Sequence, residues 1–280
     1  MPTARSEVAA AELDERVYVI GGFGPDGGAS AAVEVYDPAE NTWRARAPLP
    51  RPVHHPAAVA LGGKVYVLGG FDHGGRPVAD LQVYDPATDT WQAGPPLPTA
   101  RGALGAAVIN GRIYAVGGVA RGNTGANEEF DPQAGTWRAR APMPTPRDHL
   151  AVAAFQGRLY AFGGRRESFA RNLDVTEAYD PAADRWSPRA PLPTARSGIA
   201  AAVLGEHLYV FGGEESTKTF AEAEGYDPVA DAWSAAPPMP TARHGLGAAT
   251  VGQAIYVLAG GRTPGGSTSD LTEALQQIAP

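Results

Sequence analysis

The sequence predicts an all-β fold, a six-bladed β-propeller built from four-stranded antiparallel blades. Its hydrophobic residues show almost no helical periodicity, and the chain repeats itself with a period near fifty residues, which is typical of a radial array of small sheets. A tyrosine recurs with spacings of 48, 48, 46, 49 and 47 residues, at Tyr18, Tyr66, Tyr114, Tyr160, Tyr209 and Tyr256. A tryptophan follows it in the first five copies, at Trp43, Trp91, Trp137, Trp186 and Trp233.

Each repeat divides into four short strands, named a to d. A run of small residues (104–109) and a second apolar run (113–117) flank Asn110-Gly111, a dipeptide typical of β-hairpin turns. Strand c is the alternating segment that ends in Tyr-Asp-Pro, such as residues 80–84, because proline stops the strand. Strand d begins at the tryptophan. Six units predict one propeller domain over residues 1–280, with blades at about 1–48, 49–96, 97–143, 144–192, 193–239 and 240–280.

The sixth blade is predicted to be incomplete. Its strand c is recognisable, since Thr-Glu-Ala-Leu at 272–275 matches Thr-Glu-Ala-Tyr at 176–179 in the fourth blade. The sequence ends at Pro280, before the position of a sixth tryptophan. We therefore expect this blade to lack most or all of its outer strand d.

Composition excludes several classes of function. A net charge of −7 leaves no basic stripe for nucleic acid, and the absence of cysteine removes disulfides, thiolate nucleophiles and cysteine-ligated metals. No apolar run approaches the ~20 residues of a membrane span. Without a signal peptide at its start the chain is expected to be cytoplasmic, or secreted if it is a fragment of a longer precursor. We expect a monomer without a cofactor.

The repeated motifs resemble the kelch repeat. These motifs are the Gly-Gly doublet with a tyrosine before it, Tyr/Phe-Asp-Pro, the spaced tryptophan and a Pro-Leu/Met-Pro-x-x-Arg turn, and together they cover practically the whole chain. The resemblance implies a kelch-type β-propeller. It implies no single activity, because kelch propellers include peptide-binding adaptors, sugar-binding or sugar-isomerising proteins and copper oxidases.

The loops between strands b and c are the variable part of the repeat, and they share one end of the propeller with the d–a connections. Variation on a repeated scaffold marks the face that is free to specialise, so we expect the binding face here. These b–c loops are residues 23–30, 71–79, 119–127, 165–172, 214–220 and 262–269.

Aligning the repeats on their tyrosines defines two rings of equivalent positions at the mouth of the central channel. Eleven residues before each tyrosine lie Glu7, His55, Ala103, His149, Gly198 and Gly245. One position earlier lie Ser6, His54, Gly102, Asp148, Ser197 and His244. The resemblance to kelch adaptors that bind acidic peptides would imply arginines at such inner positions. This chain has histidines, Asp148, Glu7 and small residues there instead, so that mode of recognition does not transfer to it.

A further set of arginines recurs two positions before the first of these rings, in every repeat except the second, which has Val53. Recurrence favours a structural role over ligand contact, and we expect these side chains to hydrogen-bond the carbonyls of turns. The five residues are Arg5, Arg101, Arg147, Arg196 and Arg243.

Histidines are enriched at the mouth, with four of the six near it and His73 on a loop of the same face. A metal site would combine His54 or His55 with Asp72, His73 or His149. Blade three is expected to separate His55 from His149, and no spacing motif supports shared coordination. Polar lining of a pocket is therefore favoured, and no metal ligand is predicted.

Two loops carry distinctive side chains. In residues 165–171 three arginines surround Phe169, an arrangement suited to clamping a carboxylate and equally typical of a solvated charged loop. Glu214, Glu215 and Lys218 are interpreted as surface charge. The phenylalanines of the b–c loops (Phe23, Phe71, Phe169 and Phe220) add an apolar component. The predicted binding residues are His54, His55, Phe71, Asp72, His73, Arg121, Asp148, His149, Arg165, Arg166, Phe169, Arg171, Phe220 and His244.

Two functions remain open. The favoured one is a binding or scaffold protein that recognises a peptide, protein or glycan. The alternative is a carbohydrate-active enzyme resembling the kelch sialic-acid mutarotase/epimerase type, with Glu7, Asp148 and His149 as candidate catalytic groups and residues 165–171 beside them. A galactose-oxidase-like copper enzyme is excluded because its cofactor requires a cysteine crosslinked to tyrosine.

Overall fold

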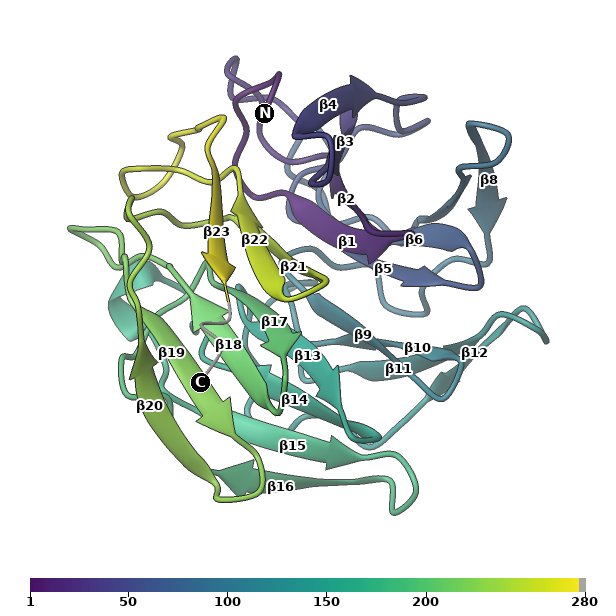
Figure 1. Cartoon of the computed structure of the whole chain (residues 1–280). Helices are drawn as coiled ribbons and strands as arrows, with labels where there is room; N and C mark the ends of the chain where they lie inside the picture. Colours follow the sequence, from purple (N-terminus) through teal and green to yellow (C-terminus); the bar gives the residue numbers. More distant parts are fainter. Residues whose placement is uncertain (277–280) are drawn as a thin grey trace.

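The computed structural model describes residues 1–276 and shows six antiparallel sheets arranged as blades around a central axis (Figure 1). Five sheets have four strands in sequential order and the sixth has three, which confirms the predicted propeller. Blades one to three contain β1 (Ala9–Leu13), β2 (Arg16–Ile20), β3 (Val33–Asp37), β4 (Thr42–Ala45), β5 (Ala57–Leu61), β6 (Lys64–Leu68), β7 (Leu81–Asp85), β8 (Thr90–Gly94), β9 (Gly105–Ile109), β10 (Arg112–Val116), β11 (Asn127–Asp131) and β12 (Thr136–Ala139). Blades four to six contain β13 (Ala151–Phe155), β14 (Arg158–Phe162), β15 (Thr176–Asp180), β16 (Arg185–Arg189), β17 (Ala200–Leu204), β18 (His207–Phe211), β19 (Ala223–Asp227), β20 (Ala232–Ala236), β21 (Gly247–Val251), β22 (Ala254–Leu258) and β23 (Thr272–Gln276).

The small residues of each strand a lie where neighbouring blades approach most closely. Strands β1, β5, β9, β13, β17 and β21 form the inner wall, each in contact with the next, and β21 contacts β1. A Cβ atom on Gly105 would lie 2.2 Å from Val152 in the next blade, and one on Gly247 would lie 2.6 Å from Ala10. Larger side chains here would force the blades apart, which explains the alanine and glycine content of these strands.

The repeated aromatic residues pack between blades. Tyr84 and Trp91 lie opposite each other on β7 and β8 with ring centroids 5.0 Å apart. The Trp91 indole donates a hydrogen bond of 2.8 Å to the carbonyl of Ala47 in blade one, and Tyr84 packs in one cluster with Tyr18. These rings therefore join blades, as the repeat predicted.

A closed circle of backbone hydrogen bonds joins the six blades at the axis. Each residue eleven before the repeat tyrosine donates its amide proton to the carbonyl of its counterpart in the preceding blade, at 2.6–3.0 Å. The circle closes from Glu7 of blade one to Gly245 of blade six. The N-terminal segment reinforces this closure, since Arg5 pairs with Ser269 and the Met1 amino group donates to the carbonyl of Asp270.

The recurring arginines are fully buried and structural. In blade three, Arg101 donates to the carbonyls of Thr99, Ala115 and Gly117 and forms an ion pair with Glu128. This confirms the expectation that the arginines hydrogen-bond turn carbonyls. Equivalent pairs are Arg5–Glu34, Arg147–Glu177, Arg196–Glu224 and Arg243–Glu273.

Blade two, which lacks this arginine, also lacks the glutamate. Val53 is fully buried, and Gln82 occupies the strand-c position that is glutamate elsewhere. The Gln82 side chain accepts a hydrogen bond from the Arg51 amide at 2.9 Å and donates to the Arg51 carbonyl at 3.2 Å. Losing both charges together avoids an unpaired buried carboxylate.

Blade six consists of β21, β22 and β23 within the described residues, and its predicted strand c is confirmed as β23. The sequence also predicts that this blade lacks most or all of its outer strand d. That prediction concerns residues 277–280, which lie outside the described part of the chain. Within residues 1–276 the only helical turn is the 3₁₀ turn Phe169–Arg171. No helix among these residues has the length and apolarity needed to cross a membrane.

Candidate functional site at the channel mouth

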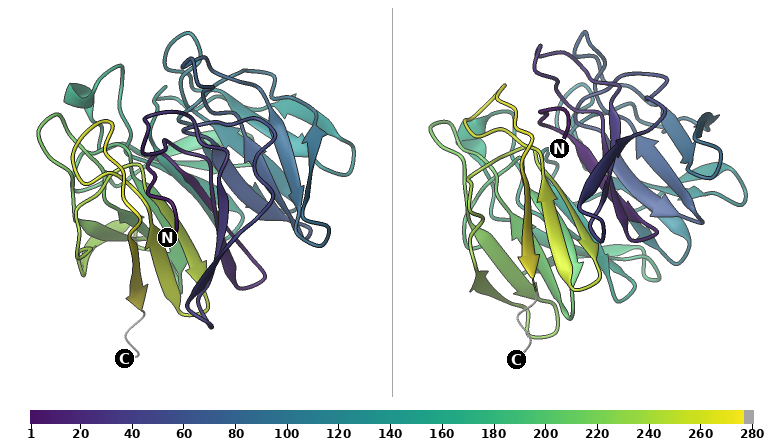
Figure 2. Two further views of the ribbon diagram at one scale, coloured as in Figure 1. Left: turned by 90° about the horizontal axis from the view of Figure 1, so that it is seen from above. Right: turned by 45° about the horizontal axis from the view of Figure 1, so that its top comes forward.

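The b–c loops and d–a connections gather at one end of the propeller, opposite the a–b turns (Figure 2). Three rings of residues line the axis there. The first two are the rings predicted from the sequence. The third, which sequence analysis missed, is the residue directly after each Gly-Gly or Ala-Gly doublet, and it bridges to the second ring in every blade. The bridges are Ser6–Phe23, His54–Phe71, Gly102–Val119, Asp148–Arg165, Ser197–Glu214 and His244–Gly261.

The first ring has an unusual backbone. All six of its residues have positive φ, which is strained for side chains other than glycine. Blades five and six use Gly198 (φ 66°) and Gly245 (φ 57°) here, whereas Glu7, His55 and His149 adopt φ values of 52°, 54° and 51°. Chemically reactive side chains thus occupy positions where the backbone favours glycine, and strain of this kind is concentrated at functional sites.

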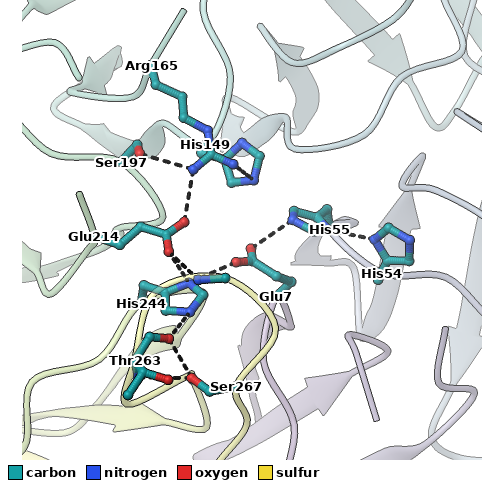
Figure 3. A network of polar contacts seen from close by, with 12 residues as sticks. Glu7, His54, His55, His149, Arg165, Ser197, Glu214, His244, Thr263 and Ser267 are labelled. Atoms are coloured by element: carbon teal, nitrogen blue, oxygen red, sulfur yellow. Dashed lines mark hydrogen bonds and ion pairs between the residues drawn. The ribbon is translucent and has the colours of Figure 1, made fainter. Parts of the chain in front are cut away.

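Glu7 lies between two histidines, one on each side (Figure 3). Its Oε2 is 3.2 Å from Nε2 of His55, and its Oε1 is 3.1 Å from Nδ1 of His244. Burial opposes ionisation of Glu7, but its interactions with His55 and His244 hold its pKa well below the usual value. The carboxylate is therefore ionised at neutral pH.

The pKa values of the histidines at the mouth shift in opposite directions. Burial lowers the pKa of His54 to about 4 and holds that of His55 well below its usual range, so both are neutral at pH 7. Their Nδ1 atoms lie 2.6 Å apart, so one of them donates to the other. For His244, burial opposes protonation, but the hydrogen bond to Glu7 and the charges of Glu7 and Glu214 raise its pKa.

A second group surrounds Arg165, the third-ring residue of blade four. Its guanidinium contacts Oε1 of Glu214 at 2.9 Å, Oδ1 of Asp148 at 3.3 Å and Nε2 of His149 at 2.8 Å. Because a guanidinium only donates, His149 accepts at Nε2 and donates from Nδ1 to Asp148. Burial opposes ionisation of Asp148, but the hydrogen bond from His149 and the charge of Arg165 lower its pKa.

The axial cavity between these groups is small. It has a volume of about 70 Å³ and is lined by first-ring residues, including Glu7, His55 and His149, together with apolar residues below them. A water molecule takes up about 30 Å³ of liquid, so the cavity holds roughly two. This cavity alone is too small for a sugar ring or a peptide side chain of ordinary size.

The predicted residues fall into two groups. His54, His55, Asp148, His149, Arg165 and His244 meet at the mouth, with Phe71 at 5.4 Å from His54. The others lie further out on the loops. His73, Arg121, Arg166 and Arg171 are exposed, Asp72 accepts from the amides of Gly74 and Arg76, and Phe169 packs under Arg165 at 4.2 Å.

Four expectations about this face need correction. Blade three does not keep His55 from His149, since their ring centroids are 4.8 Å apart across the narrow axis. Glu214 is not surface charge but is 1% exposed, and Phe220 lies in the core at 4%. The three arginines of blade four do not form one free clamp. Arg165 turns into the mouth, while Arg171 pairs with Glu167.

The face is more basic than the rest of the protein. Its six b–c loops contain seven basic and five acidic residues, against 23 and 30 in the whole chain. The exposed cations stand on the outer loops, and the carboxylates Glu7, Asp148 and Glu214 are buried at the centre. An acidic ligand is therefore favoured on the rim and disfavoured at the axis.

Comparison with known proteins gives a family and a fold. A family model described as the KLHDC2/KLHL20/DRC7 Kelch-repeats domain matches residues 1–140 and 130–261. The F-box/kelch-repeat protein At1g67480 of Arabidopsis thaliana is 44% identical over 52 residues, and Beta-scruin of Limulus polyphemus is 38% identical over 53 residues. Each match covers 19% of this chain but only 14% and 6% of those proteins. The solved structure of YjhT superposes with a TM-score of 0.85 over 99% of both chains at 17% identity, a likeness of fold alone.

Proposed function

Because this chain belongs to the kelch-repeat family, we propose that it is a binding or scaffold protein that recognises a peptide, protein or glycan on the face of the b–c loops and d–a connections. The observation that carries the proposal is the division of the repeat. Recurring residues build the blades and their contacts, whereas the rings and b–c loops of this face differ from blade to blade.

The chemistry of the rim favours a ligand that carries a carboxylate beside an apolar group. Arg121 and Arg166 are exposed cations on adjacent blades, three and four. Their loops are in contact, since the amide of Glu167 donates to Asn123 at 2.9 Å. Phe169 offers a half-buried ring close by. A guanidinium that binds a carboxylate next to an aromatic ring provides both affinity and orientation.

The test begins with glycan and peptide arrays and continues with titration of the strongest hit. Replacing Arg121 and Arg166 together with alanine should weaken binding at least about tenfold, because each charge-assisted hydrogen bond contributes about 1.5–3 kcal/mol. The matched control replaces Arg44 and Arg138, two exposed arginines on outer strands β4 and β12, and should change affinity less than about twofold. Equal losses in both double variants would refute a site on the rim.

A second candidate is a carbohydrate-active enzyme of the kelch sialic-acid mutarotase/epimerase type. It is supported by one observation, the ionised Glu7 within hydrogen-bond distance of both His55 and His244 beside the axial cavity. Exchange between the anomers of N-acetylneuraminic acid, followed by NMR, is expected to be faster with the protein and to return to the uncatalysed rate with Glu7→Gln. Unchanged exchange rates with the folded wild-type protein would exclude this candidate.

A further inference from the structure

We infer that Glu7, Glu214 and His244 form a site for one divalent metal ion of the zinc type at the channel mouth. Nδ1 of His244 lies 3.1 Å from Oε1 of Glu7 and 3.4 Å from Oε2 of Glu214, and one ligand atom from each of the three residues lies within 4.8 Å of the others. In a tetrahedral site with zinc–ligand bonds of about 2.0–2.1 Å, neighbouring ligand atoms are roughly 3.3 Å apart. The two closest contacts already match this spacing.

The hydrogen bonds of His244 leave a position for a cation. Its Nε2 lies 3.2 Å from the carbonyl oxygen of Thr263, which can only accept, so Nε2 carries a proton. Nδ1 faces oxygen atoms of both Glu7 and Glu214, so either a second proton on the imidazole or a metal ion must lie among these three atoms. Metal-bound histidines typically fix their tautomer in this way, through a carbonyl on the other nitrogen.

Surrounding groups hold both carboxylates in place. The amide of Gly265 donates to Oε2 of Glu214 at 2.9 Å, and Arg165 binds its other oxygen. A Cβ atom on Gly245 would lie 2.5 Å from Oε1 of Glu7, and one on Gly261 would lie 2.5 Å from Nε2 of His244. Glycine at these two positions therefore leaves the space that the ligands occupy.

An alternative trio, Glu7, His55 and His149, fits less well. Nε2 of His149 already accepts a hydrogen bond from Arg165 at 2.8 Å, and a metal ion there would face that guanidinium at close range. In the favoured trio Arg165 binds Oε1 of Glu214 while Oε2 faces His244, and the two carboxylates match the double charge of one divalent ion. All three residues are buried, with exposed fractions of 8% for Glu7, 1% for Glu214 and 0% for His244.

One of the three ligands, Glu7, adjoins space for an exchangeable fourth ligand. Glu7 also lines the axial cavity, whose volume of about 70 Å³ suffices for roughly two water molecules. Three protein ligands and one water is the arrangement of zinc sites that remain open to an incoming oxygen atom. The inference goes beyond the binding function proposed above and does not depend on it. It also departs from the sequence prediction of no metal ligand, which weighed His54, His55, Asp72, His73 and His149 but not Glu214.

The test uses the full chain after chelation and dialysis at pH 7. Calorimetric titration with Zn²⁺ should show one ion per chain, and Co²⁺ should give the intense visible absorption of tetrahedral coordination. The isosteric variants Glu214→Gln and Glu7→Gln should each weaken zinc binding at least about tenfold. His207→Ala, at the far end of the propeller on β18, is the control and should leave zinc binding unchanged.

Three results would overturn the inference. They are no stoichiometric zinc binding by the folded wild-type protein, a cobalt spectrum without tetrahedral bands, or equal affinity in the wild type and Glu214→Gln. Circular dichroism establishes that each variant is folded. The cobalt spectrum of the wild type decides the question even if a variant fails to fold. The NMR signals of His244 in the metal-free protein provide one more check. If they change with pH but not on addition of zinc, a proton and not a metal ion lies between His244 and the two carboxylates.

Discussion

The propeller contains two sets of buried charges, the arginine–glutamate pairs of the blades and the cluster at the channel mouth, and they differ in repetition. The pairs recur in five blades with the same geometry, one fully buried guanidinium on one carboxylate and on backbone carbonyls. At the mouth each blade contributes a different combination of side chains. Of the three buried carboxylates there, Asp148 and Glu214 contact the guanidinium of Arg165, and Glu7 contacts His55 and His244.

The difference separates structure from specialisation. The recurring arginines donate to equivalent backbone carbonyls in their blades, so they are tied to the scaffold and recur with it. The charged residues of the mouth do not make these scaffold contacts. The positive φ angles of Glu7, His55 and His149 also indicate a functional role. Glycine would relieve the backbone strain at these positions, yet side chains with chemical groups occupy them. Four predictions test this contrast, from the largest expected effect to the smallest.

Replacing Arg147 with leucine should be strongly destabilising. The variant leaves Glu177 as an unpaired buried charge and removes donors from the carbonyls of Thr145, Ala161 and Gly163. Breaking a buried pair in this way costs about 3–5 kcal/mol in free energy of unfolding. Urea denaturation measures the loss, and a value below about 1 kcal/mol would show that these pairs are not essential to the scaffold.

Removing both charges of that pair should restore much of the stability. Arg147→Val with Glu177→Gln copies the combination found in blade two, where Val53 and Gln82 stand at the same positions. Since the double variant leaves no unpaired carboxylate, we expect it to recover more than half of the loss, a coupling of about 2 kcal/mol. The same denaturation experiment applies. A double variant as unstable as Arg147→Val alone would contradict the pairing argument.

At the mouth, relieving backbone strain should increase stability. Ala103 has φ 53° in the first ring and contributes no polar group, so Ala103→Gly should raise the free energy of unfolding by roughly 0.5–1 kcal/mol. The control is Ala106→Gly on β9, where the strand backbone gives glycine no advantage and stability should fall. Destabilisation by Ala103→Gly would mean that the ring is not strained.

The smallest effect concerns exposed aspartates of the c–d turns. Hydrogen bonds from Tyr84 and the Ala47 amide lower the pKa of Asp89, and those from Tyr179 and the Ala141 amide lower that of Asp184. The ordinary pKa of an aspartate is 3.8, and folding lowers it at both positions. Their contribution to the free energy of unfolding is therefore present above pH 3.8 and is lost as pH falls through the folded-state pKa. Asp89→Asn with Asp184→Asn should therefore flatten the acid side of the stability curve.

Blade one already has asparagine, Asn41, at the equivalent position, where it forms a hydrogen bond of 2.8 Å with Tyr36. Denaturation at pH 3 to 7 measures the slope, and an unchanged slope would assign the acid sensitivity to other groups.

Local sequence was sufficient for the blades. Glycine doublets, Tyr-Asp-Pro and tryptophan predict strands and turns from neighbouring residues, and six copies of one pattern predict a ring. The structural role of the arginines followed from recurrence alone. Strand c of blade six was also predicted, because its sequence matches that of blade four.

The functional site depended on tertiary structure. Ring closure brings Glu7 to within 3.1 Å of His244, which is 237 residues away, and the narrow axis places His55 beside His149 across a blade. Glu214 looked like surface charge because it neighbours Glu215 and Lys218, yet its place after the doublet turns it inward. The repeat thus determined by itself how each blade folds, since those contacts are local. Which side chains meet at the axis was decided only when six blades closed on one another, because no local pattern specifies contacts between distant repeats.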